Sequence, residues 1–68
     1  MDQQEAVADI ELRAWEERVS IRFLCLRAGI HPSTFWRWKK TDHNPEPVNA
    51  NLGTLKKLYA ALDEIAAE

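Results

Sequence analysis

Basic side chains gather in one part of this chain of 68 residues. Between Arg18 and Lys40 the sequence carries six bases and no acid, although the net charge of the whole chain is −2. Guanidinium and ammonium groups bind phosphate oxygens, and an arginine can also give two parallel hydrogen bonds to a guanine edge. The chemistry that this segment could perform is contact with a nucleic acid.

The flanking segments carry the opposite charge. Residues 1–17 hold six acids and one base, a net charge of −5, residues 18–57 have a net charge of +6, and residues 58–68 have −3. Such an asymmetry is typical of a domain that presents one basic surface to phosphates.

The basic segment reads as two short helices joined by a glycine turn. Ser20 can cap the first helix, whose apolar residues at helical spacing are Ile21, Leu24, Cys25 and Ala28. Gly29 suits the position that ends a helix, and Ile30 supplies the apolar contact of that turn. The second helix begins with a proline, which suits a first helical position, and is predicted to run over residues 32–40.

The second helix has a buried side and an outward side. At about 100° per residue, Phe35 and Trp38 share one face. The opposite face carries Ser33, Trp36, Arg37 and Lys40.

These positions carry a family resemblance. The apolar and glycine pattern of Leu24, Cys25, Gly29, Ile30, Phe35 and Trp38 resembles the helix-turn-helix of the Cro/CI-like (XRE-type) phage and bacterial repressors. The resemblance extends over most of residues 18–66, and transposase and excisionase modules carry similar segments. The resemblance implies an all-α fold, a small four-helix domain with a central helix-turn-helix as in lambda repressor. It also implies binding to double-stranded DNA, and we expect a homodimer on a two-fold operator.

Three residues are the expected base contacts. Arg37 is the first choice, with contact to phosphate alone as the alternative. Ser33 lies where the recognition helix of the family enters the major groove. Trp36 departs from the family, which carries polar or small side chains there. Its indole could contact a thymine methyl, lie on a sugar edge or fold back against the following loop.

Six further residues are expected to contact the DNA backbone. The N-terminus of the first helix of the pair points at a phosphate in the family, and each lysine would add about one unit of salt dependence. The expected backbone contacts are Ser20, Arg22, Arg27, Thr34, Lys39 and Lys40.

A first helix is predicted over residues 2–18, with Asp2 as its cap. It has two apolar strips, one of Ala6, Val7, Ile10 and Ala14, the other of Ala8, Leu12, Trp15 and Val19. One strip should pack on the helix pair, while the other is either half buried or meets another subunit. Phe23 and Leu26 are likewise either half buried or in contact with another subunit, because both lie outside the buried face of their helix.

The remaining chain is predicted to be a loop and a final helix. Residues 41–50 contain Pro45 and Pro47 among polar neighbours and form the loop. The helix over residues 51–66 carries an apolar face of Leu52, Leu55, Leu58, Tyr59, Leu62, Ile65 and Ala66. This face should close the core, and a two-helix interface is the alternative.

Other functional classes find little support in the sequence. The single cysteine cannot form an intrachain disulfide, and no signal peptide or membrane span is recognisable, so we expect a protein of the cytoplasm. The resemblance implies that it is bacterial or phage-encoded. Cys25, His31 and His43 have no metal-site spacing, and Cys25 should be a packing residue where the family has alanine. We expect no enzyme activity, cofactor, metal or small-molecule ligand.

Two functions remain from the sequence. The first is a sequence-specific transcriptional regulator, expected to be a repressor that acts by covering its operator. The second is a protein-interaction module on a helix-turn-helix scaffold, which would bind another regulator through its acidic first helix or its leucine-rich last helix.

Overall fold

The computed structural model describes residues 2–68, and within that range it contains four α-helices and no strand. The helices are α1 (Gln3–Glu16), α2 (Ile21–Arg27), α3 (Pro32–Trp36) and α4 (Leu52–Ala67). The prediction of an all-α fold with four helices is confirmed.

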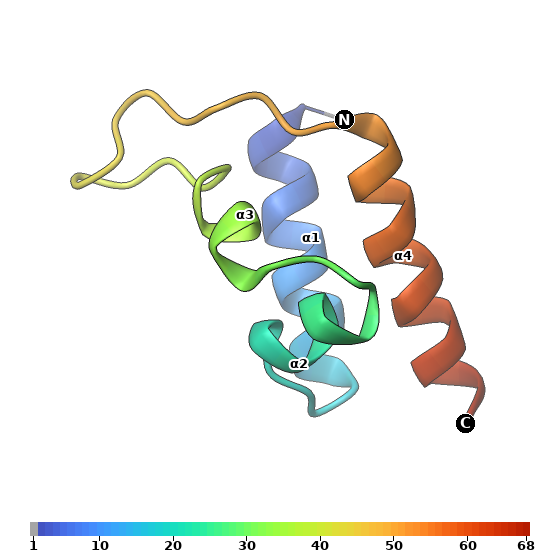
Figure 1. Ribbon diagram of the computed structural model, residues 1–68. Coiled ribbons are helices and arrows are strands. Elements are labelled where there is room, and N and C mark those ends of the chain that lie inside the picture. Colours follow the sequence, from blue (N-terminus) through green and yellow to red (C-terminus); the bar gives the residue numbers. More distant parts are fainter. Residues whose placement is uncertain (1) are drawn as a thin grey trace.

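The two long helices, α1 and α4, lie side by side, and the short pair α2–α3 lies across one face of them (Figure 1). The segment between α3 and α4 extends away from the helices and then returns past the N-terminal end of α1. Helix α4 contacts both α1 and α2, so it closes the core as expected.

One cluster of buried side chains holds the four helices together. Of the two predicted strips on α1, the strip that contains Val7 and Ile10 is buried, and the strip that contains Leu12 and Trp15 is exposed. The pairs Leu24–Cys25 and Phe35–Trp38 are buried as predicted. The cluster consists of Val7, Ile10, Ala14, Leu24, Cys25, Ile30, Phe35, Trp38, Leu58, Ala61, Leu62 and Ile65.

Helix α1 begins at its predicted cap and ends earlier than predicted. The Asp2 carboxylate accepts a hydrogen bond of 2.8 Å from the backbone N–H of Glu5. The helix ends at Glu16 because Arg18 adopts a φ of 59°, and the N–H of Val19 donates to the Ala14 carbonyl at 3.0 Å. This is the hydrogen-bond pattern of a Schellman motif, formed here without the usual glycine.

Helix α2 has the predicted start and end. The Ser20 hydroxyl accepts from the N–H of Phe23 at 2.9 Å. Gly29 has a φ of 75°, and the N–H of Ile30 donates to the Cys25 carbonyl at 2.8 Å. The turn between the two short helices is therefore a Schellman motif with glycine at its left-handed position.

Helix α3 is shorter than the predicted range of residues 32–40. It ends at Trp36, and the N–H groups of Trp38 and Lys39 make tighter bonds to residues three positions back. The carbonyl groups of the residues that follow the helix, Arg37, Trp38 and Lys39, accept hydrogen bonds from other parts of the chain. The prediction was wrong about the length of this helix, although its first residue, Pro32, is correct.

Helix α4 begins after Asn51, whose side chain accepts from the N–H of Thr54 at 3.2 Å. Its buried residues include Leu58 and Leu62, but Leu52 is 66% exposed and Ala66 is exposed as well. Leu52 lies in the first turn, before the part of α4 that supplies the core cluster, whereas Ala66 follows Ile65, which belongs to that cluster. The predicted apolar face is therefore correct except at Leu52 and Ala66.

Candidate nucleic-acid interface

The start of α3 is fixed by an unusual cap. His31 precedes the helix, and its Nδ1 atom accepts from the backbone N–H of Ser33 at 3.1 Å. The same Nδ1 atom lies 2.7 Å from the hydroxyl oxygen of Ser33. The Ser33 hydroxyl, an expected base contact, is therefore engaged by His31 at the first turn of the helix.

Trp36 and Arg37 lie together on the outward side of α3. The indole of Trp36 is 47% exposed, and the Arg37 side chain is exposed as well. Phe35 and Trp38, which flank this pair, are almost completely buried. The structure thus confirms the predicted separation of this segment into a buried side and an outward side.

The backbone of Arg37 is held although its side chain is exposed. Its N–H donates to the Ser33 carbonyl at 3.1 Å. Its carbonyl accepts from the N–H of Val48 at 3.2 Å and from the side-chain amide of Asn44 at 3.1 Å. Within residues 2–68 no carboxylate pairs with the Arg37 guanidinium. A fixed backbone therefore presents a guanidinium that is available to an external acceptor.

Two glutamines of α1 hold the segment after α3, and the sequence analysis did not single them out. Gln4 donates to the Trp38 carbonyl at 2.8 Å and accepts from the N–H of Lys40 at 3.0 Å. Gln3 donates to the same Trp38 carbonyl at 3.0 Å and to the Val48 carbonyl at 2.8 Å. These bonds join residues more than 30 positions apart, so no local pattern in the sequence could have indicated them.

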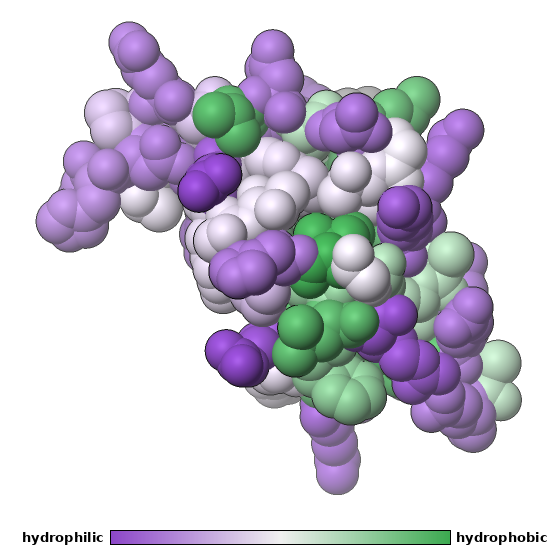
Figure 2. Space-filling view, in the orientation of Figure 1, coloured by the Kyte–Doolittle hydropathy of each residue, from purple (hydrophilic) through white to green (hydrophobic). Residues whose placement is uncertain are grey.

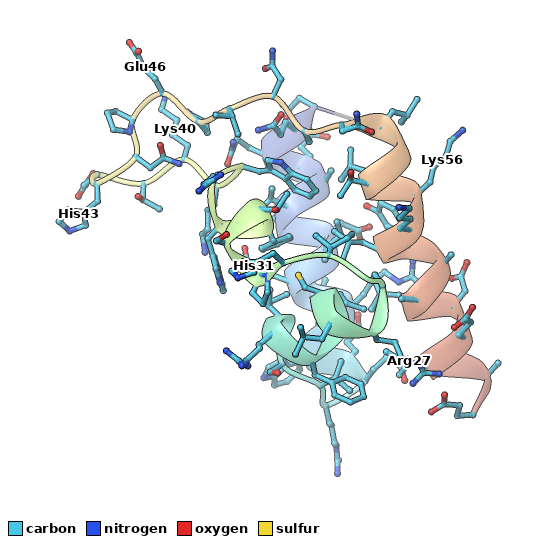
Figure 3. The ribbon with its side chains drawn as sticks, in the orientation of Figure 1. Arg27, His31, Lys40, His43, Glu46 and Lys56 are labelled. Atoms are coloured by element: carbon cyan, nitrogen blue, oxygen red, sulfur yellow. The ribbon has the colours of Figure 1, made fainter. Side chains whose placement is uncertain are left out.

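The loop after α3 also holds the segment that follows the helix, through hydrogen bonds from Asn44. The side-chain amide of Asn44 donates to the Lys39 carbonyl at 3.0 Å as well as to the carbonyl of Arg37. His43 and Glu46 lie on the outer part of this loop, where their side chains point away from the helices (Figure 3). The loop therefore holds the backbone of residues 37–39, while its own acid, Glu46, points away from the helices.

The expected backbone contacts fall into two groups according to their ion pairs. Arg27 forms ion pairs with Glu68 and, at 4.0 Å, with Glu64. Its bond to Glu68 raises the pKa of Arg27. Lys39 pairs with Glu11 at 2.9 Å. Both cations are thus neutralised by acids of the chain itself.

The other expected backbone contacts have no acidic partner. Among the described residues, Arg22 and Lys40 form no ion pair, and both side chains are exposed. Thr34 is half buried, and Ser20 uses its hydroxyl to cap α2. Figure 3 shows Lys40 beside the loop and Arg27 at the opposite end of the molecule, next to the end of α4. The structure therefore does not bring all the predicted bases together.

Several large apolar side chains remain exposed outside the α3 segment. Trp15 on α1 is 76% exposed and borders a shallow hollow, lined also by Glu16, Arg18 and Val19. Phe23 and Leu26 point outward from α2, and Figure 2 shows green, apolar surface over that helix between purple, hydrophilic side chains. These side chains supply apolar surface beyond what the core uses.

Within residues 2–68 there is no cluster of metal-ligating side chains and no exposed thiol. No group of three or more His, Cys, Asp or Glu side chains gathers where it could hold a metal ion. Cys25 is fully buried, and burial raises the pKa of its thiol. No helix in the described range has both the length and the apolar character needed to cross a membrane.

Comparison of the chain with protein-family models, with curated proteins and with solved structures gives no match. The function proposed below therefore depends on the geometry of the α2–α3 pair and on the sequence pattern that produces it.

Proposed function

We propose that the protein is a sequence-specific double-stranded DNA-binding transcriptional regulator with a lambda-repressor-like arrangement of its helices. Helix α3 and the segment that follows it, residues 32–40, enter the major groove. The observation that carries the proposal is the exposed Arg37, which has a fixed backbone and no acidic partner in the described chain.

The surroundings of Arg37 support this role. A guanidinium that approaches a guanine must be exposed, must not be paired with an acid, and must come from a rigid segment. Phe35 and Trp38 anchor the segment in the core, while Gln4 and Asn44 bind its carbonyl groups. Of the basic residues expected to contact the backbone, Arg22 and Lys40 are the two that are exposed and form no ion pair among the described residues, so they can bind phosphates.

The regulatory mechanism would be occlusion of a promoter. Occlusion requires only that the four-helix domain binds its site, with no further activity. We propose a homodimer on a two-fold operator, because a single short helix reads only a few base pairs. A bound dimer would act as a repressor by covering its site.

A second candidate is supported by the exposed apolar residues. A domain that binds only DNA has no evident need for Trp15, Phe23 and Leu26 on its surface, whereas protein interfaces are enriched in such aromatic side chains. A protein-interaction module would use these residues, and the α2–α3 pair would then serve as its scaffold.

Selection of binding sites from a random double-stranded DNA library at near-physiological salt separates the two candidates. The wild-type protein is compared with Arg37→Ala and with Lys57→Ala, which removes one exposed charge from α4. The proposal expects a two-fold motif for the wild type and for Lys57→Ala. It also expects loss of preference at one position per half-site in Arg37→Ala.

Circular dichroism should show that all three proteins are folded. Recovery of no motif by the folded wild type would contradict the proposal and favour the interaction module. Equal motifs from the wild type and Arg37→Ala would mean that Arg37 contacts only phosphate.

A further inference from the structure

Trp36 is an exposed aromatic side chain whose position is fixed from two sides. Its ring meets the buried ring of Phe35 edge to face, with 5.3 Å between centroids and an interplanar angle of 82°. The ammonium group of Lys39 lies 5.7 Å from the centroid of the indole ring, within the range of a cation–π contact. The side chain is nevertheless 47% exposed, so the indole can contact a partner outside the chain.

The positive charge of Lys39 beside the indole is already neutralised by Glu11. Lys39 lies 2.9 Å from the Glu11 carboxylate, and both side chains are only partly exposed. A DNA phosphate placed at this edge of the indole would meet the carboxylate of Glu11 together with the ammonium of Lys39. Arg37, the next residue, has an unpaired guanidinium in the described chain. The outward surface of residues 33–40 thus has a neutral apolar part next to a basic part.

We infer that the indole of Trp36 packs against the C5 methyl group of a thymine in the major groove, an inference that rests on the proposed DNA-binding function. That methyl is the one apolar group that base edges present in the major groove. An exposed indole gains from contact with it, because apolar surface leaves water on both sides. Contact with the sugar–phosphate backbone would instead place a phosphate close to Glu11, where the local charge offers it no net attraction.

Replacement of thymine by deoxyuridine tests this directly, because it removes the methyl group and leaves the base pair intact. A site is first selected with the wild-type protein, and each thymine of one half-site is then replaced singly by deoxyuridine. At one thymine, beside the position read by Arg37, wild-type affinity should fall about fourfold, as expected for the loss of one buried methyl group. Replacement at thymines outside the contact should leave the affinity unchanged.

Two variants assign the effect to Trp36. Trp36→Gln should bind the thymine and the deoxyuridine forms of the site equally well. Arg37→Ala should bind both forms more weakly and still prefer thymine about fourfold. Thermal unfolding followed by circular dichroism checks that each variant is folded. The deoxyuridine series uses the wild-type protein alone, so it still tests the thymine contact if a variant fails to fold.

The failures of the two proposals are distinguishable. A selected site that contains no thymine, or one in which every deoxyuridine replacement leaves wild-type affinity unchanged, overturns the thymine contact and leaves DNA reading by Arg37 standing. Equal discrimination between thymine and deoxyuridine by the wild type and Trp36→Gln also overturns it. If the folded wild type selects no sequence at all, the proposed function fails, and the thymine contact fails with it.

Discussion

Gln4 of the first turn of α1 donates a hydrogen bond of 2.8 Å to the carbonyl of Trp38, 34 residues further along the chain. Gln3 donates to the same carbonyl at 3.0 Å. The two side-chain amides therefore satisfy a backbone carbonyl that lies beyond the end of α3. They tie the first helix to the segment that we propose enters the major groove.

We expect removal of these amides to destabilise the protein in a way that is not additive. Gln3→Ala and Gln4→Ala should each lower the free energy of unfolding by about 1 kcal/mol, since the Trp38 carbonyl keeps one donor in each variant. The double variant should lose more than the sum, because that carbonyl is then left without a donor. Urea unfolding measures all three. Glu16→Ala, an exposed change on the same helix, is the control and should stay within about 0.5 kcal/mol of wild type.

The two neighbouring lysines should contribute differently to DNA binding. Lys40 has no acidic partner in the described chain, so Lys40→Ala should lower the slope of log affinity against log salt by about 0.9. Lys39→Ala should leave the slope almost unchanged, since Glu11 already neutralises that ammonium. Glu11→Gln should release Lys39 and make the slope steeper. Fluorescence anisotropy over a range of salt concentrations measures these slopes, and equal effects of the two lysines would contradict the assignment.

The sequence predicted the structure correctly where a local pattern determines it. Ser20, Gly29 and Pro32 mark the boundaries of α2 and α3 through their own backbone preferences, and the structure confirms all three. The buried positions Phe35 and Trp38 follow from helical periodicity even though α3 ends between them, because Arg37 keeps right-handed helical backbone angles of φ −68° and ψ −19°.

The sequence was insufficient where residues far apart meet. The segment that follows α3 is held by Gln4 and Asn44, whose roles become visible only in three dimensions. The neutralisation of Arg27 by Glu68 likewise joins residues 41 positions apart. Charge counted along the chain therefore overstated the free positive charge, because it could not tell which bases were already paired.

The two Schellman turns offer a matched pair of stability tests. Arg18 occupies a left-handed position with a φ of 59°, where a side chain costs roughly 1 kcal/mol, so Arg18→Gly should raise the free energy of unfolding by up to that amount. Arg18→Ala keeps the strain and removes the charge, so it serves as the control. If Arg18→Ala stabilised the protein as much as Arg18→Gly, the gain would come from the charge and not from the backbone.

Gly29 occupies the corresponding left-handed position after α2, and its substitution should destabilise the protein. Gly29 has a φ of 75°, and an added Cβ would meet no atom within 4 Å, so the cost of Gly29→Ala is backbone strain alone. We expect a loss of roughly 1 to 2 kcal/mol in the free energy of unfolding. Gly29→Asn should lose less, because asparagine tolerates the left-handed region better. Urea unfolding measures both, and equal losses would indicate a packing defect in place of strain.

Stability should also fall at alkaline pH because of two titrating groups, the buried Cys25 thiol and the partly buried Tyr59 hydroxyl. Burial raises the pKa of the Cys25 thiol above its ordinary value of 9.0. Burial and the hydrogen bond that Tyr59 donates to Asp9 raise the pKa of the Tyr59 hydroxyl above its ordinary value of 10.0. Above those ordinary values the unfolded chain loses protons that the folded chain retains, so the free energy of unfolding decreases as pH rises. The stabilising contribution is complete below about pH 9, the ordinary value of the thiol.

The thiol part of this dependence can be separated with one substitution. Cys25→Ala keeps a small side chain between the helices and removes the titrating group, so its free energy of unfolding should fall less steeply than that of the wild type between about pH 9 and pH 10. Urea unfolding at a series of pH values gives the two slopes. Parallel curves for the wild type and Cys25→Ala would mean that the thiol titrates equally in the folded and unfolded chains. That result would contradict the burial of Cys25 between α2 and the rest of the core, on which the close packing of the helix pair depends.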